Sequence, residues 1–235
     1  MYSELDAAGG LGNALQAQFD QLCSCLTVSS DGLSDNKSVT HSRVERGKKF
    51  SQIYRAAEEP LYLPDFWREG VCLAHGQTDN LGALAKSLDF WLCKDVTTRE
   101  LVAAFSFINP ADKAAAFDEG REIAFTWERI QADGARTDLK AFVDLAIRDD
   151  VLRRLFPFTS LFTLCFSRCT GYPYTHDTPT VTPLGKRVFG GHQYEVRLPG
   201  NRIAGRGSAA EALAIVKTNL PPNIKPAVKG TAENV

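Results

Sequence analysis

Residues 161–169 read LFTLCFSRC, an apolar run of aromatic and β-branched side chains that is typical of a buried β-strand. Further along the chain, residues 194–198 and 202–204 flank a Pro-Gly-Asn turn and predict a β-hairpin. Ser208 and Glu211 then form a capping box, the pattern that opens a helix. The last third of the chain is therefore expected to be rich in strands and to end in a helix.

Upstream of this run, between residues 77 and 155, the apolar residues recur with a helical period. Thr97 and Glu100 make another capping box. A long helix is predicted over residues 110–132, with Pro110 in its first turn. Thr137 is expected to cap the next helix. The middle of the chain should therefore be a helical layer.

The N-terminal part combines a helix with short strands. The apolar spacing over residues 12–23 is helical, whereas residues 39–44 and 50–56 alternate as two strands joined by Arg46-Gly47-Lys48. Residues 71–75 read as a further short strand. Strands, then helices, then strands indicate an α+β fold with a mixed or antiparallel sheet and a helical layer.

We expect one domain that spans residues 1–222. Its parts would be a strand-rich region over residues 1–70, a helical region over residues 77–155, and a strand-rich region with the terminal helix over residues 160–220. Residues 223–235 follow two prolines, are polar, and are expected to form a disordered tail.

The composition excludes several classes of protein. With 44% hydrophobic and 23% charged residues in 235, the chain has the composition of a globular protein. No apolar run approaches the ~20 residues needed to span a membrane, and the first ten residues lack the features of a secretory signal, so we expect a cytoplasmic protein without membrane contact. The net charge of −1 argues against binding of nucleic acid.

The charge is nevertheless distributed unevenly. Residues 151–235 contain 11 Lys and Arg against 4 Asp and Glu, a net of +7, and residues 1–150 carry a net of −8. The basic third could be a solvated surface, or it could bind an anionic ligand or an acidic partner.

The sequence predicts neither a metal site nor a cofactor. Its six cysteines form no C-x-x-C motif and lie near no pair of histidines, so a structural zinc site is not expected. We expect Cys23, Cys25, Cys165 and Cys169 to be buried free thiols. P-loop, dinucleotide-binding, G-x-S-x-G and H-E-x-x-H motifs are all absent from the sequence.

Candidate functional residues cluster where the predicted strand ends and a proline-rich loop begins. Arg168 could hold a sulfate, phosphate or carboxylate group, and His176 or Asp177 could remove a proton from an amine. The other candidates for a substrate pocket are Ser167, Thr170, Tyr172, Tyr174, Trp127 and Glu128.

Structural roles remain open for most of these residues. Arg168 could pair with a carboxylate of a helix, His176 could cap a turn, and the two tyrosines could serve packing alone. Glu128 could be solvated surface.

Several motifs over residues 70–221 resemble an actinomycete family of natural-product biosynthesis proteins. The motifs are LFPFTS at 155–160, FSRCTGYPY at 166–174, G-x-T-x-x-L at 76–81, Trp91, L-x-x-x-F-x-F at 101–107, Trp127, and EALAIVKTNLP at 211–221. A His usually follows Thr-Ser in that family, whereas this chain has Leu161 there, so no role of that His is carried over.

Within that family, the chain looks like the larger, aziridine-forming subunits of azinomycin and vazabitide biosynthesis. The resemblance implies an enzyme that closes an aziridine ring by attack of an amine and elimination of sulfate. It implies two partners, a small second subunit and an acidic amino-group carrier protein that bears the diamino acid substrate, and it implies no cofactor. Two alternatives are a non-catalytic binding or activating subunit of a biosynthetic complex, and an interaction protein of the bacterial immunity type.

Overall fold

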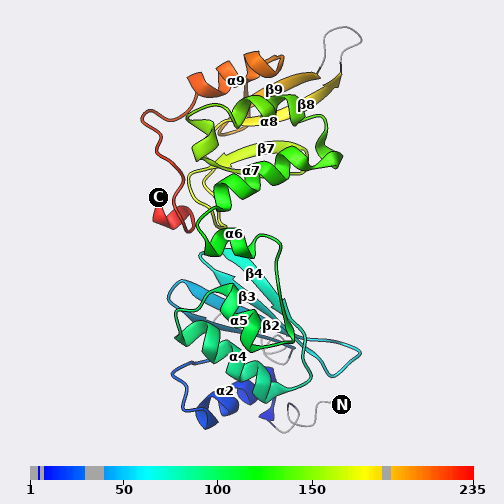
Figure 1. The fold of residues 1–235 in the computed structure, drawn as a ribbon, viewed down its shortest axis with the longest axis vertical. Coiled ribbons are helices and arrows are strands. Elements are labelled where there is room, and N and C mark those ends of the chain that lie inside the picture. Colours follow the sequence, from blue (N-terminus) through cyan, green and yellow to red (C-terminus); the bar gives the residue numbers. More distant parts are fainter. Residues whose placement is uncertain (1–4, 6–7, 30–39, 187–191) are drawn as a thin grey trace. The chain divides into compact units, whose positions relative to one another are not determined.

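The computed structural model describes residue 5 and residues 8–29, 40–186 and 192–235. The chain divides into two compact units, residues 1–120 and residues 121–235, and each unit is described by itself (Figure 1). In the described parts of the chain, no helix is both long and apolar enough to cross a membrane.

The first unit holds an antiparallel sheet of five described strands in the order β1-β2-β3-β4-β5. Its elements are α2 (Leu11–Gln21), β1 (His41–Arg46), β2 (Lys49–Arg55), β3 (Tyr62–Arg68), β4 (Val71–Gly76), α4 (Leu81–Cys93), α5 (Thr98–Ala104), β5 (Ile108–Pro110) and α6 (Ala114–Asp118). Helices α2 and α4 pack against one face of the sheet, where Leu84, Leu88 and Trp91 of α4 are buried with Phe66 and Leu73.

The second unit repeats this plan with different helices. Its described strands form an antiparallel sheet in the order β10-β9-β8-β7-β6. The elements are α7 (Glu122–Ala132), η1 (Gly134–Arg136), α8 (Lys140–Ala146), η2 (Leu152–Arg154), β6 (Phe156–Ser160), β7 (Thr163–Ser167), β8 (Thr180–Lys186), β9 (His192–Leu198), β10 (Arg202–Gly207), α9 (Ala209–Thr218) and η3 (Ala232–Asn234). Helices α7, α8 and α9 lie along this sheet (Figure 1). The core between them contains Trp127, Phe142, Phe166, Val181 and Tyr194.

The predicted α+β class and the antiparallel pairing are confirmed, although the strands form two sheets and the helices contribute to both units. The helical region predicted over residues 77–155 is therefore not one layer, because the unit boundary falls at Gly120. That residues 1–222 behave as a single domain stays a prediction.

The predicted strand over residues 161–169 is wrong in detail. Ser160 pairs with Thr163, so Leu161 and Phe162 form a two-residue turn between β6 and β7. Both side chains are exposed, by 84% and 76%, and the φ angle of Leu161 is 52°, in the left-handed region. The apolar run therefore contains a hairpin tip. The prediction missed it because hydrophobicity alone does not locate a tight turn.

The predicted helix over residues 110–132 is confirmed only in part, because α7 covers Glu122–Ala132 but the helix is not continuous. Pro110 lies in strand β5, where it pairs with Ala74, and two separate helices follow. Gly120 stands between them with a φ angle of 73°, which glycine adopts without steric cost. Thr137 precedes the next helix but does not cap it, because α8 begins at Lys140 after Leu139.

Two further differences concern β3 and the C-terminal segment. Strand β3, Tyr62–Arg68, was not predicted, and Val39 of the first predicted strand lies outside the described residues. The segment after Pro222, expected to be disordered, is held by backbone hydrogen bonds. Thr170 and Gly171 donate to the carbonyls of Val228 and Gly230, and Val228 donates to Arg168. Parallel pairing with the β7–β8 loop thus orders a segment that has little apolar content.

Candidate functional site

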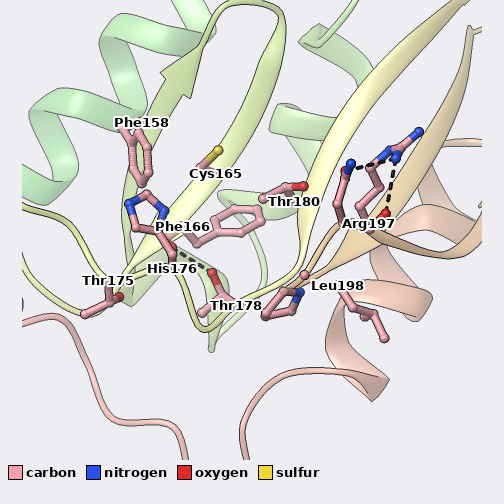
Figure 2. Close-up of a pocket in the computed structure, with 12 residues that line it drawn as sticks. Phe158, Cys165, Phe166, Thr175, His176, Thr178, Thr180, Arg197 and Leu198 are labelled. Atoms are coloured by element: carbon pink, nitrogen blue, oxygen red, sulfur yellow. Dashed lines mark hydrogen bonds between the residues drawn. The ribbon is translucent and has the colours of Figure 1, made fainter.

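The second unit contains a pocket of about 210 Å³ between the β6–β7 hairpin and the β9–β10 turn (Figure 2). Its lining residues are Phe158, Cys165, Phe166, Thr175, His176, Thr178, Thr180, Arg197, Leu198, Pro199, Gly200 and Asn201. We call it the His176 pocket. Its size suits a small molecule such as a modified amino acid, since drug-sized ligands occupy pockets of about 300 Å³ or more.

The loop between β7 and β8 forms one wall, and internal hydrogen bonds fix it. The hydroxyl of Ser167 accepts from the backbone N–H groups of Cys169 and Thr175 at 3.0 and 3.2 Å. Thr175 Oγ1 accepts from the N–H of Arg168, and Thr178 Oγ1 donates to the carbonyl of Phe166 at 2.7 Å. Ser167, predicted to bind substrate, is fully buried and holds the loop in place.

His176 is the ionisable group that this loop presents to the pocket. Its ring lies edge-on to Phe158, with centroids 6.1 Å apart and an interplanar angle of 79°. The imidazole is exposed, and neither of its nitrogens has a hydrogen-bond partner among the residues that the structure describes. The ring can therefore hydrogen-bond to a molecule in the pocket, with one nitrogen as donor and the other as acceptor when it is neutral.

Arg197 lies on the opposite side of the pocket (Figure 2). Its Nε donates to Glu195 Oε1 at 2.6 Å, and its guanidinium also donates to the side-chain oxygen of Asn201 at 2.9 Å. Arg206 Nε donates to the other oxygen of Glu195 at 2.7 Å. These hydrogen bonds lower the pKa of the buried Glu195 carboxyl, and the bond from Arg206 has the largest effect. Two guanidinium groups thus share one carboxylate, and of these three residues only Arg197 lines the pocket.

Arg168 does not face the His176 pocket. Its Nε and a terminal nitrogen both approach Asp177 Oδ2, at 2.8 and 2.7 Å. The Arg168 side chain lines a different cavity, of about 390 Å³, formed with residues 221–226, Val228, Asn234 and Val235. Arg168 and His176 thus line separate cavities. Arg168 does form an ion pair, but its partner is Asp177 of the β7–β8 loop and not the carboxylate of a helix.

The two tyrosines differ in their surroundings. Tyr174 stacks on Phe158 with a centroid separation of 4.3 Å, and burial raises the pKa of its phenol. Tyr172 is 67% exposed and meets Tyr174 edge-on. Thr170 is buried beside the C-terminal segment. Tyr174 therefore supports the wall that carries Phe158, whereas Tyr172 and Thr170 are not among the pocket's lining residues.

The helix residues proposed for the pocket also lie elsewhere. Trp127 is buried in the core, where its Nε1 donates to the carbonyl of Leu155 at 3.2 Å. Glu128, its neighbour, is exposed on α7. Helix α7 therefore packs against the sheet and does not contribute to the His176 pocket.

Sequence reasoning missed Arg197 and Asn201, because only the pairing of β9 with β8 places them in one pocket with His176. The predicted hairpin over residues 194–204 was the available signal, since a turn beside a buried strand is a frequent place for binding residues. The sequence of the β9–β10 turn alone, however, does not predict that the loop carrying His176 lies opposite it.

The first unit has a basic pocket of about 450 Å³ that was also missed. It is lined by Arg46, Lys48, Lys49, Arg68, Glu69, Leu92, Cys93, Lys94 and Asp95. Lys49 Nζ donates to the carbonyls of Trp91, Lys94 and Val96, and burial with the nearby Arg68 lowers its pKa. Arg68 is paired with Asp118, at 2.7 Å. Much of this positive charge is thus already engaged by the protein itself.

The cysteines follow the prediction only in the second unit. Cys165 and Cys169 are buried, as expected, and burial raises the pKa of Cys165 to about 11. Cys23 and Cys25 are exposed, so their prediction as core thiols is wrong. Both lie after the end of α2 at Gln21, so they are not part of the apolar face of that helix.

Comparison with known proteins gives one match, to a family model, and this match lies in the second unit. A family model described as a family of unknown function (DUF6193) matches residues 121–231, which is nearly the whole of that unit. No curated protein and no solved structure matches the chain.

Proposed function

We propose that the second unit binds a small anionic substrate in the His176 pocket, and that the imidazole of His176 accepts a proton there. The observation that carries this proposal is an exposed imidazole, without a hydrogen-bond partner in the described chain, in the same pocket as Arg197. A base must reach the proton that it removes, and a fixed guanidinium orients an anionic group.

The reaction that we propose, from the family resemblance, is closure of an aziridine ring on a sulfated diamino acid. The nitrogen forms a bond to the carbon that bears the sulfate ester, the carbon–oxygen bond breaks, and sulfate leaves with the electron pair. The amine, with a free pKa of ~10.4, gives its proton to His176. Sulfate is a very weak base, so its departure needs no general acid and no cofactor.

The pocket supports such a reaction by orientation. The β7–β8 loop is fixed by the hydroxyls of Ser167, Thr175 and Thr178, so that His176 is presented on a stiff segment. Arg197 would hold the sulfate on the other side, because its own position is fixed by Glu195 and Asn201. Ring closure depends mostly on alignment of the amine with the bond that breaks, which is what a fixed pocket provides.

We also propose the assembly that this reaction implies. The chain would act in the cytoplasm with a small second subunit, on a substrate attached to an acidic amino-group carrier protein. The net charge of +7 over residues 151–235 supports attraction of an acidic carrier.

Binding is tested first, without the carrier. Resonances of the four histidines are followed by NMR while sulfate or a sulfated diamino acid is added to the full chain. We expect the His176 signal to move, whereas His192, which approaches Asp138 at 3.4 Å in the same unit, should not move. Absence of any shift at His176 with both ligands would overturn the binding proposal.

Turnover is tested with the second subunit and the loaded carrier. We expect His176→Gln to slow sulfate release at least tenfold at neutral pH, and His192→Gln to leave it unchanged. Binding without sulfate release by the parent chain would reject the aziridine reaction and leave a non-catalytic binding subunit. Parental rates in His176→Gln would reject His176 as the base.

A further inference from the structure

The β3–β4 hairpin of the first unit brings three potential metal ligands onto one face of the sheet. Asp65 of β3 lies opposite His75 of β4, and Trp67 lies opposite Cys72. Cys72 and His75 are three residues apart, so a regular strand would direct them to opposite faces. The register shift between Phe66 and Trp67 adds one residue to β4 at this point.

This bulge reorients the side chains. Leu73 and Ala74 are both buried, whereas Cys72 is half-buried and His75 is exposed, so the two potential ligands share the outer face with Asp65. Bulges are frequent beside functional sites, where they redirect a side chain. The bulge is independent of the chemistry of the three residues, yet it is the feature that assembles them.

The three side chains are already close together. His75 Nδ1 lies 2.9 Å from Asp65 Oδ1, and Cys72 Sγ lies 3.8 Å from each nitrogen of the His75 ring. One ligand atom from each residue can be chosen so that all three lie within 4.8 Å of one another. Tetrahedral zinc, with bonds of ~2.0–2.3 Å, separates its ligand atoms by roughly 3.3–3.8 Å. Small side-chain rotations therefore suffice to place all three around one ion.

We propose that Asp65, Cys72 and His75 bind a Zn²⁺ ion, with a fourth position open to water or a substrate. Thiolate, imidazole and carboxylate together are ligands of zinc, whereas Mg²⁺ and Ca²⁺ prefer oxygen alone. One carboxylate and one thiolate balance the charge of the ion, and the exposure of His75 leaves a side open to solvent. Three protein ligands with one open position are typical of a zinc ion that takes part in a reaction.

Cys72 must lose its proton to bind the ion, and its surroundings oppose that loss in the absence of metal. Burial raises the pKa of this thiol to about 11, and the charge of Asp65 adds to the effect. The ammonium group of Lys113 acts on the same thiol in the opposite sense. Zinc would displace the thiol proton, as it does at other cysteine sites. The site was not predicted from the sequence because its ligands come from two strands and follow no known motif.

The test uses Co²⁺ as a spectroscopic substitute for zinc in the chelator-treated full chain. We expect a thiolate-to-cobalt charge-transfer band and the intense visible bands of tetrahedral cobalt, both abolished when zinc is added. Cys72→Ser should remove the charge-transfer band, and His75→Ala should weaken cobalt binding at least tenfold. Because His75 is exposed, its variant should keep the parental melting temperature.

A pair of cysteines elsewhere in this unit provides the control. Cys25 Sγ and Cys93 Sγ lie 3.5 Å apart and could also bind a metal, so Cys93→Ser is measured beside Cys72→Ser. The proposal requires that Cys93→Ser keeps the full spectrum. It is overturned if the parent chain gives no charge-transfer band, if the band survives Cys72→Ser, or if Cys93→Ser abolishes it.

Asp65→Asn, which keeps the shape of the side chain, should also weaken binding tenfold or more, and unchanged affinity would remove Asp65 from the site.

Discussion

Arg168 and Asp177 join the two ends of the loop that presents His176. Arg168 Nε donates to Asp177 Oδ2 at 2.8 Å, and a terminal nitrogen of the same guanidinium lies 2.7 Å from that oxygen. The other carboxylate oxygen, Oδ1, is buried and accepts no hydrogen bond within the described chain. The pair therefore closes the loop next to His176, although neither partner lines the His176 pocket.

The first prediction is that this ion pair stabilises the fold and takes no part in the reaction. Arg168→Lys keeps the charge but loses the paired geometry of the guanidinium, so we expect a loss of about 1 kcal/mol in the free energy of unfolding. Turnover per folded molecule should stay nearly parental. Chemical denaturation and single-turnover rates, measured side by side, check both halves of the prediction.

A surface ion pair in the same unit gives the control for Arg168. Arg153 and Asp150 are 3.0 Å apart and both well exposed, so Arg153→Lys should leave the stability unchanged. A large loss of turnover in Arg168→Lys at parental stability would return Arg168 to the role of an anion clamp.

The second prediction concerns pH and Glu195. Arg206 and Arg197 lower the pKa of this carboxyl in the folded chain, so its contribution to stability is full above the unfolded pKa of ~4.3 and is lost as the pH falls through the folded pKa. Glu195→Gln should cost about 1–2 kcal/mol at pH 7 and progressively less in acid. Urea unfolding at pH 7, 5 and 3 measures the difference.

Glu128→Gln, on the exposed face of α7, is the matched control and should have little effect at any of these pH values. If the curves of the parent chain and Glu195→Gln ran parallel from pH 7 to pH 3, the two arginines would not be stabilising the charged carboxylate.

Local signals in the sequence were sufficient for many elements of the fold. Both capping boxes form as predicted, at Thr97 with Glu100 and at Ser208 with Glu211. The hairpin around Gly47 also forms, with Arg46 paired to Lys49 and a φ angle of 59° at the glycine. Each of these signals lies within a few residues and depends little on the rest of the chain, so the sequence is a reliable guide to it.

The candidate sites depend on contacts that the sequence does not show. His176 and Arg197 line one pocket because of the order of strands in a sheet, and His75 meets Asp65 through a bulge. The loop after Ser167 was recognised as functional because polar groups gather there, but Arg168 and His176 face different cavities. The direction of a side chain is set by register and by distant segments, which local periodicity cannot reveal.

The third prediction is that Cys25 and Cys93 form a disulfide under mild oxidation. Their sulfur atoms lie 3.5 Å apart, and a terminal nitrogen of Arg46 donates to Cys25 Sγ at 2.7 Å, which places a positive charge beside the thiol. Diamide should take two protons and two electrons from the pair, forming one disulfide and the reduced hydrazine. Peptide mass mapping before and after treatment identifies the linked cysteines.

Cys93→Ser should abolish this product, whereas Cys165→Ser, at a buried site in the second unit, should not. A linkage that instead joined Cys23 to Cys25, or no linkage at all, would show that the two thiols do not reach bonding geometry.

The last prediction concerns the tip of the β6–β7 hairpin. Leu161 has a φ angle of 52° and is 84% exposed, so its side chain has little contact to offset a left-handed backbone. Asparagine tolerates that conformation better, and Leu161→Asn should raise the free energy of unfolding by about 0.5–1 kcal/mol. The bond from Arg136 to the carbonyl of Leu161 is unaffected by the change. Phe162→Ser is the control, since it removes a similarly exposed apolar side chain from a residue outside the left-handed region, and it should have no such effect. Chemical denaturation of both variants measures the free energy of unfolding and separates relief of backbone strain at Leu161 from the effect of removing exposed apolar surface. Destabilisation by Leu161→Asn would mean that the leucine side chain makes a contact that outweighs the strain at this turn.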